Sequence, residues 1–214
     1  MSERRPIASR NSKLAARVAK ALAEHGISPN LISQFSMVFA ALAGMAFWLS
    51  GTTGGFLNVV CLVCAAIGCQ FRLLCNLFDG MVAVEGGRGA PDGPFWNEAP
   101  DRVADAVILV GLGLGTGHPD LGWAAAAFAI GTAYVRELGS AQGLGADFRG
   151  PMAKPQRMAV ATVAAILAIF VPVILGWSVL HLALWVIVLG SVVTMLRRSR
   201  GVIASLNSAC KSAE

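Results

Sequence analysis

The sequence predicts an all-α integral membrane protein with six transmembrane helices and an N-terminal amphipathic interfacial helix. Three observations support this fold class: 56% of the 214 residues are hydrophobic, only 14% are charged, and the mean hydropathy is +0.65. These values are too apolar for a soluble domain of this size. No stretch alternates apolar and polar residues with the period of two that a membrane barrel shows, so helices are the expected spans.

Residues 1–26 are expected to form a basic segment in the cytoplasm or at the membrane interface. Leu14, Val18 and Leu22 fall on one helical face with basic residues around it, which suits a helix lying on an anionic membrane surface. The alternative is a solvated basic tail that only sets the membrane topology. Gly26 and the turn residues after it are expected to end the helix.

Six apolar stretches follow, each close to the roughly 20 residues that a helix needs to cross the hydrocarbon layer. We expect the spans at residues 31–50, 55–79, 96–115, 121–138, 158–177 and 178–196. Together they form one membrane domain over residues 27–200, which a cytoplasmic tail of residues 201–214 follows.

Lysines and arginines gather beside alternate connections of these spans. They lie before the first span, near the second and fourth connections and after the last span, whereas the connections at 51–54, 115–119 and 176–177 contain none. Because basic residues collect in cytoplasmic loops, both termini and the functional site are expected on the cytoplasmic face of a bacterial inner membrane. The net charge of +5 is therefore attributed to contact with membrane lipids. No nucleic-acid partner is expected, because no basic motif with interleaved aromatic residues is present.

Acidic and amide side chains lie at the cytoplasmic ends of the second and third spans. Asn76 and Asp79 are three residues apart, and Asn97, Asp101 and Asp105 follow at intervals of four, so each set shares one helix face. Ionisable groups beside a span are costly and mark functional sites. Oxygen ligands that converge from two helices suit a hard divalent cation such as Mg²⁺ or Mn²⁺.

The connection between these two spans is rich in small residues. They are Gly80, Ala83, Gly86, Gly87, Gly89 and Gly93. Such residues let the backbone approach a ligand closely. Because the GxxxxGK[ST] pattern of a phosphate-binding loop is missing, the segment fits a nucleotide diphosphate that a metal ion bridges to the protein.

The spacing of these residues resembles the signature of the CDP-alcohol phosphatidyltransferase family, D-x2-D-G-x2-A-R-x8-G-x3-D-x3-D. With every interval kept, the pattern falls on Asn76, Asp79, Gly80, Ala83, Val84, Gly93, Asn97 and Asp101, and five of these eight positions are identical. The segment SPNLIS at 28–33 is similar to the Pro-Asn-x-x-Thr entry to the first span in that family, with Ser33 in the place of the threonine.

The resemblance implies an enzyme of phospholipid biosynthesis. It would transfer a phosphatidyl or other phosphoalcohol group from a CDP-linked lipid donor such as CDP-diacylglycerol to an alcohol acceptor and release CMP. Glycerol phosphate, inositol phosphate and serine are among the family's acceptors, and the sequence does not choose between them.

The same resemblance assigns roles to individual residues. The metal site would comprise Asn76, Asp79, Asn97 and Asp101. Asp101 would also be the catalytic residue that deprotonates or orients the acceptor hydroxyl. The CDP moiety would contact Gly80, Ala83 and Gly93.

Three positions depart from the family pattern. Asn76 and Asn97 replace aspartates, and Val84 replaces an arginine, so the formal charge of the four ligand positions falls from minus four to minus two. We therefore expect weaker metal binding, one tight ion instead of two, or help from the auxiliary acids Glu98 and Asp105. The alternative is a catalytically degenerate family member that acts as a non-enzymatic membrane protein binding nucleotide or lipid. A transporter is less well supported, because no repeated halves are visible.

Basic residues near the fourth and fifth spans are candidates for an anionic acceptor or lipid headgroup. Arg136 lies inside a span, where a guanidinium is costly without a partner. Lys154 and Arg157 are the other two candidates, although both could simply anchor the chain at the cytoplasmic surface. A homodimer is a further possibility. The small residues Gly111, Gly113 and Gly115 would let helices pack closely, and the resemblance to the family implies a dimer.

Overall fold

The computed structural model describes residues 12–85, 87 and 91–211 and is almost entirely helical. Its elements are α1 (Lys13–Glu24), α2 (Pro29–Ser50), α3 (Gly55–Glu85), α4 (Gly93–Gly115), α5 (Pro119–Ala141), α6 (Lys154–Phe170), β1 (Val173–Ile174), β2 (Trp177–Ser178) and α7 (Val179–Lys211). Two of the connecting glycines, Gly86 and Gly89, and the first eleven residues of the basic segment lie outside the described residues.

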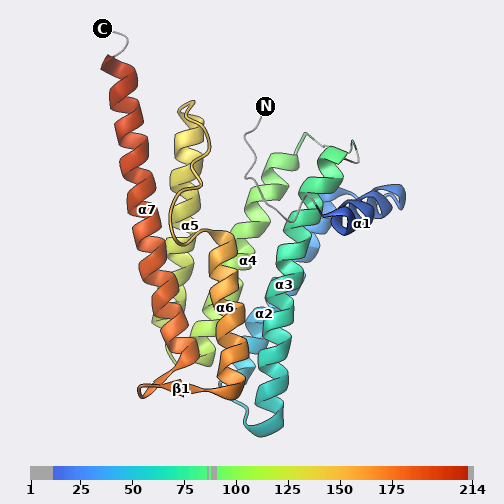
Figure 1. Cartoon of the computed structure of the whole chain (residues 1–214), viewed down its shortest axis with the longest axis vertical. Coiled ribbons are helices and arrows are strands. Elements are labelled where there is room, and N and C mark those ends of the chain that lie inside the picture. Colours follow the sequence, from blue (N-terminus) through green and yellow to red (C-terminus); the bar gives the residue numbers. More distant parts are fainter. Residues whose placement is uncertain (1–11, 86, 88–90, 212–214) are drawn as a thin grey trace.

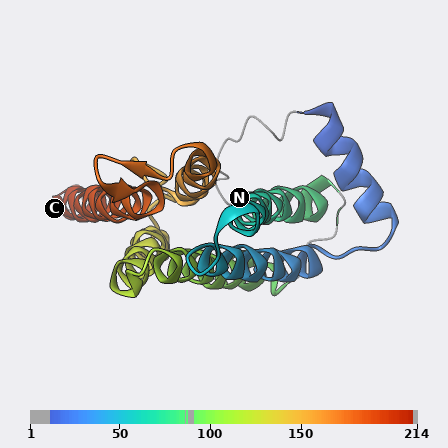
Figure 2. The same ribbon diagram turned by 90° about the horizontal axis from the view of Figure 1, so that it is seen from below.

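The six long helices stand in two rows of three (Figure 1; Figure 2). One row contains α3, α6 and α7, and the other contains α2, α4 and α5. The helices pack as a closed ring in the order α3, α2, α4, α5, α7 and α6, with α6 returning to α3. This arrangement places helices that are distant in the sequence, such as α3 and α6, next to each other.

The short helix α1 forms where the sequence predicts it and lies beside the bundle, against α3 (Figure 1). Its Ala15 and Ala19 are buried in a small cluster with Met81 and Val82 of α3. Leu14 is 70% exposed. The helix therefore packs Ala15 and Ala19, with Leu22 partly buried beside them, against the rest of the chain and leaves Leu14 exposed.

Three helices within the described residues are long and apolar enough to cross a membrane. They are Pro29–Ser50, Gly55–Val84 and Val179–Ser208, which supports an integral membrane protein. The remaining predicted spans coincide with α4, α5 and α6, but these helices are less apolar or shorter, and α6 has only 17 residues. Six crossings therefore remain a prediction.

Many alanines are buried inside the bundle beside large side chains such as Phe47 and Leu109, and many other large apolar side chains face outward. Ala43 and Ala104 are fully buried, whereas Leu42, Phe56 and Phe170 are between 60% and 83% exposed. Helices in lipid associate through close packing of small residues, because lipid tails are as apolar as leucine. The outward-facing apolar surface is thus the one that a membrane would cover.

Glycines bring α4 into backbone contact with its neighbours. A Cβ added at Gly111 would lie 2.2 Å from the carbonyl oxygen of Gly44 in α2, and one at Gly113 would lie 2.6 Å from Cα of Gly122 in α5. Gly115 likewise faces the backbone of α2. The predicted close packing at these glycines therefore occurs within the chain, so these three glycines are not available to a second copy.

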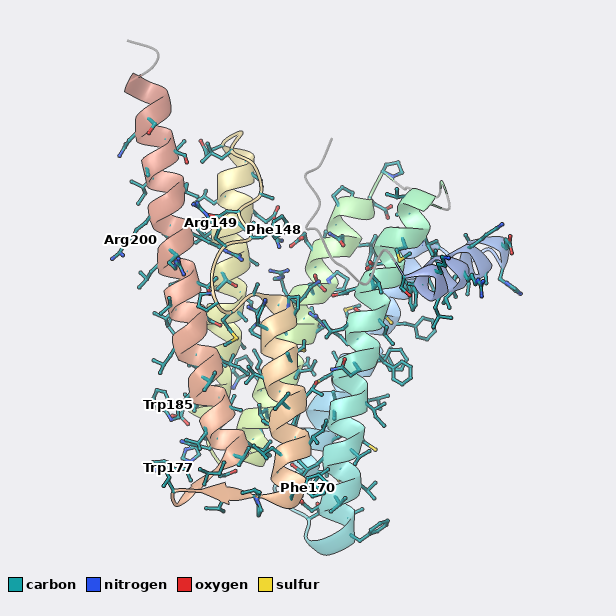
Figure 3. All side chains as sticks on the ribbon, viewed as in Figure 1. Phe148, Arg149, Phe170, Trp177, Trp185 and Arg200 are labelled. Carbon is teal, nitrogen blue, oxygen red and sulfur yellow. The ribbon has the colours of Figure 1, made fainter. Side chains whose placement is uncertain are left out.

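The prediction that two spans meet at residues 177 and 178 is wrong. α6 ends at Phe170, and β1 and β2 form a two-stranded antiparallel hairpin before α7 begins. Leu175 and Gly176 make the turn with φ values of 50° and 82°, the positive values that suit a two-residue hairpin turn. Trp177 lies at this hairpin end, while Arg149 and Arg200 lie toward the opposite end (Figure 3). At that opposite end α7 continues past residue 200 to Lys211, so the predicted tail begins inside a helix.

Candidate functional site

A cavity of about 1120 Å³ lies between the two rows of helices, in the half of the bundle away from the hairpin. Phe148, which lines it, is labelled in that half in Figure 3. The lining includes these candidate residues from α3, α4, α5 and α6: Asn76, Asp79, Gly80, Ala83, Gly93, Asn97, Glu98, Asp101, Arg136, Lys154 and Arg157. The structure thus brings together every candidate residue named from the sequence except Asp105.

Asp79 is held at the wall of the cavity by two hydrogen bonds. The Ser33 hydroxyl of α2 donates to Oδ2 at 2.7 Å, and the backbone N–H of Gly80 donates to Oδ1 at 2.5 Å. Asp79 is 4% exposed. Ser33 belongs to the SPNLIS segment, which resembles the family's entry to the first span. This segment therefore contacts the motif directly, through the hydrogen bond from Ser33 to Asp79.

Near the cavity, hydrogen bonds to Asp92 join the start of α2 to the start of α4. Asn30 donates a hydrogen bond from Nδ2 to Asp92 Oδ1 at 3.1 Å, and Trp96 donates from Nε1 to Asp92 Oδ2 at 3.0 Å. Asp92 directly precedes α4. These bonds fix the start of α4, which carries Asn97 one turn further on, beside the start of α2.

Lys154 reaches from α6 into the centre of the motif. Its Nζ donates to Asn76 Oδ1 at 2.5 Å and also forms a short ion pair with Asp101 Oδ2. The other oxygen, Asp101 Oδ1, is buried and has no hydrogen-bond partner in the described part of the chain, although Arg72 Nη2 lies 3.5 Å away. The structure therefore places Lys154 among the predicted metal ligands, whereas the sequence assigned it to the acceptor.

Asp105 lies behind the cavity between two arginines. Arg72 Nη2 contacts its Oδ1 at 2.7 Å, and Arg157 Nη2 forms a short ion pair with its Oδ2. Arg157 also donates to the carbonyl oxygen of Met152 at 3.1 Å. The side chains of this Arg72–Asp105–Arg157 cluster are at most 2% exposed, so both oxygens of Asp105 are engaged away from the cavity. Its predicted help to a metal ion would require the cluster to open.

Arg136 is surrounded by carboxylates. Its Nη2 lies 2.5 Å from Glu98 Oε2 and its Nε lies 2.8 Å from Glu137 Oε1. The same oxygen of Glu98 accepts a hydrogen bond from Arg102 at 3.1 Å. Glu98 therefore pairs with two arginines beside the cavity, and the partly buried guanidinium of Arg136 has carboxylate partners that offset the cost of its burial.

The loop between α5 and α6 is tied to α7. Arg198 donates to the carbonyl oxygen of Arg149 at 2.9 Å and to that of Thr132 at 2.8 Å. Within the loop, hydrogen bonds from Arg149 hold the pKa of Asp147 below its usual range. These contacts fix the loop residues, Phe148 among them, along one wall of the cavity.

The donor set of the motif fits a hard divalent cation. No group of three or more His, Cys, Asp or Glu residues within the described ranges is placed to hold a metal, so any site here must combine carboxylate and amide oxygens. Asp79 and Asp101 supply the carboxylates, and Asn76 and Asn97 supply amide oxygens of the kind that Mg²⁺ and Ca²⁺ accept. A buried oxygen without a partner, such as Asp101 Oδ1, is costly unless a ligand satisfies it.

Two residues at the site were not predicted from the sequence as functional. Arg72 is fully buried in α3, and the signal that could have found it is an arginine within an otherwise apolar span. Ser33 could have been found from its place in the SPNLIS segment, but its partner Asp79 is 46 residues away.

Comparison of the sequence with known proteins finds relatives over most of its length, although no family model matches. The chain is 28% identical over 200 residues to phosphatidylinositol phosphate synthase of Mycolicibacterium smegmatis, which covers 90% of this chain and 85% of the relative. It is 30% identical over 158 residues to archaetidylinositol phosphate synthase of Aeropyrum pernix, which covers 74% of this chain and 75% of the relative.

The fold is similar to crystal structures of Mycobacterium tuberculosis phosphatidylinositol phosphate synthase. The structure in complex with manganese and citrate has a TM-score of 0.71 at 19% identity and covers 88% of each chain. The structure with CDP-DAG bound has a TM-score of 0.72 at 19% identity and covers 89% of this chain and 94% of that one. At this level of identity the likeness establishes a shared arrangement of helices.

Proposed function

The chain belongs to the CDP-alcohol phosphatidyltransferase family, and on this premise we propose that it transfers a phosphatidyl group from CDP-diacylglycerol to an alcohol acceptor and releases CMP. The observation that carries the proposal is the cavity, whose lining gathers the motif oxygens of α3 and α4 with basic side chains of α5 and α6. The protein is accordingly a membrane-embedded transferase of phospholipid biosynthesis.

We assign Mg²⁺ or Mn²⁺ to the motif, held by Asp79 and Asp101 with the amide oxygens of Asn76 and Asn97. When bound, such an ion neutralises charge on the diphosphate and on the departing CMP. The manganese in the related Mycobacterium tuberculosis structure supports this assignment. Ser33 and the Gly80 amide keep Asp79 in place for it.

The chain's own residues would position the acceptor. Its hydroxyl oxygen attacks the phosphorus that carries the diacylglycerol, the bond from that phosphorus to the bridging oxygen breaks, and CMP leaves with that oxygen. Asp101 takes the hydroxyl proton or orients the hydroxyl, and its buried Oδ1 is the oxygen that has no hydrogen bond within the described chain. The ion pair of Lys154 with Oδ2 fixes the orientation of this carboxylate.

We further propose an acceptor and an orientation in the membrane. The relatives are named for phosphatidylinositol phosphate and archaetidylinositol phosphate, so inositol phosphate is the first acceptor to test. The basic residues near alternate connections support six crossings with both termini and the cavity on the cytoplasmic side of an inner membrane. A homodimer, if formed, would have to use residues other than the glycines of α4.

CMP release from CDP-diacylglycerol tests the function directly. Purified protein with Mg²⁺ or Mn²⁺ is incubated with inositol phosphate, glycerol phosphate, serine and other alcohols in turn. We expect CMP with at least one acceptor, loss of activity in chelator, and a fall of about 100-fold or more in Asp79→Ala and Asp101→Asn, because each removes a group that acts on the reacting atoms. Asp120→Asn, at the hairpin end of α5, is the matched control and should retain activity.

The opposite result is equally clear. Failure of the wild-type protein to release CMP with any acceptor and either metal, together with cytidine-nucleotide binding that chelator does not change, would favour the non-enzymatic alternative.

A further inference from the structure

The ammonium group of Lys154 lies among the side-chain oxygens of the motif. It is bonded to Asn76 Oδ1 of α3 and to Asp101 Oδ2 of α4, while the lysine itself begins α6. Two of the four positions that the family pattern gives to metal ligands are thus contacted by one protein cation. Pro155 follows directly and suits the first turn of a helix, so the lysine projects from a fixed start of α6.

The charge around the motif supports one divalent ion better than two. Asp79 and Asp101 are the two carboxylates of the motif that line the cavity. The nearby acids are engaged elsewhere: Asp105 pairs with Arg72 and Arg157, and Glu98 pairs with Arg102 and Arg136. With the lysine counted, the motif carries a net charge close to minus one before any ion binds. A second divalent ion would have to bind against a net positive charge.

The amide of Asn76 is a suitable hydrogen-bond acceptor for the ammonium group of Lys154. An amide oxygen accepts a hydrogen bond from an ammonium group without adding a second negative charge. An ammonium group has three donors, and the described residues take two of them. The third is available to an oxygen of the CDP diphosphate in the same cavity.

We propose that the Lys154 ammonium is a built-in cation of the transfer site, which takes the place of one metal ion, so that the chain binds a single divalent ion. This inference rests on the proposed function. The replacement of the first motif aspartate by Asn76 and the presence of Lys154 are then two halves of one arrangement. Lys154 serves the donor phosphates rather than the acceptor.

Counting bound Mn²⁺ by electron paramagnetic resonance on the full-length protein tests this directly, without substrate. We expect one Mn²⁺ per chain in the wild type. Lys154→Met should bind its Mn²⁺ about tenfold more tightly or better, because a nearby positive charge is removed. Lys154→Arg keeps the charge and should match the wild type, and so should Lys20→Met, which removes a lysine charge from α1. Unchanged or weaker Mn²⁺ binding by Lys154→Met overturns the proposal.

A second pair of variants covers the case in which Lys154→Met folds poorly. Asn76→Asp should still bind one ion, because the lysine remains, whereas Asn76→Asp combined with Lys154→Met should bind two. One ion in the double variant, or two in Asn76→Asp alone, contradicts the built-in cation. CMP release by the wild type is measured separately, so a failed transferase and a failed lysine role give different results.

Discussion

Arg72 of α3 and Asp105 of α4 form a 2.7 Å ion pair whose two side chains are 0% and 2% exposed. Arg157 of α6 completes the cluster from the other side. Three helices from both rows of the bundle therefore meet at one carboxylate. Because Arg72 also lies 3.5 Å from Asp101 Oδ1, the cluster supports the helix positions on which the cavity depends.

Breaking this cluster should destabilise the protein. Arg72→Met leaves the buried Asp105 with a single partner, and Asp105→Asn leaves two buried arginines without their carboxylate. We expect each to lower the free energy of unfolding by about 3 kcal/mol or more, the usual cost of removing one partner from a buried pair. Thermal unfolding of the detergent-solubilised protein measures the effect. Arg149→Met, which removes an exposed partner of Asp147, should change the midpoint little.

The double variant sharpens the test. Arg72→Met with Asp105→Asn should cost less than the sum of the two single changes, because residues of one network are coupled. Strictly additive losses would show that the two side chains act independently.

Ser33 should matter through its hydroxyl group. Ser33→Ala removes the 2.7 Å hydrogen bond to Asp79, and hydrogen bonds to charged groups contribute about 1.5 to 3 kcal/mol. We expect CMP release to fall about tenfold and the apparent metal affinity to weaken. Ser33→Thr keeps a hydroxyl at the same position and should restore most of the activity. Equal losses in both variants would point to packing instead of the hydrogen bond.

Gly111 should not tolerate a side chain. Its Cβ would lie 2.2 Å from the Gly44 carbonyl oxygen, so Gly111→Ala must push α2 and α4 apart, and overpacking of this kind costs about 1 to 3 kcal/mol or more. Gly54→Ala is the matched control, since an added Cβ there meets nothing within 4 Å. Comparison of their unfolding midpoints in detergent checks the expectation. A stable Gly111→Ala variant would mean that the two backbones are further apart than described.

Glu98 should tune the response to charged acceptors. Glu98→Gln removes the carboxylate that pairs with Arg136 and Arg102, so the cavity becomes more positive. The KM for a phosphorylated acceptor should fall several-fold, while that for an uncharged alcohol should stay close to its wild-type value. Steady-state CMP release with inositol phosphate and inositol measures both. Glu24→Gln on α1 removes an equivalent charge from the pair with Lys20 and should shift neither KM.

Helical periodicity and fixed spacing were enough to predict the motif's geometry. Asn76 and Asp79 share a face of α3, Asn97 and Asp101 share a face of α4, and all of them line one cavity. The approximate positions of the long helices were also predictable, because a long apolar stretch indicates a helix without knowledge of its tertiary contacts. The end of α6 was harder, because residues 171–178 are apolar and were assigned to the ends of two spans. In the structure, strand pairing and the positive φ values of Leu175 and Gly176 define a hairpin there.

The partners of the charged residues could not be read from the sequence. Asp105 keeps the same spacing as Asp101, yet one helix turn deeper it meets Arg72 and Arg157 instead of the cavity. Lys154 lies 53 residues from Asp101, and no local pattern indicates that α6 would bring it there. Such pairings depend on how α3, α4 and α6 pack, which is a property of the whole bundle.

The length of α7 has a practical consequence for work with this protein. Its 33 residues correspond to about 50 Å of helix, against about 30 Å of hydrocarbon. Even with a tilt of about 20°, the helix outreaches the bilayer by more than two turns on the side away from the hairpin. A fluorescent protein joined after α7 would therefore be carried on a rigid helix that projects beyond the surface of the bilayer.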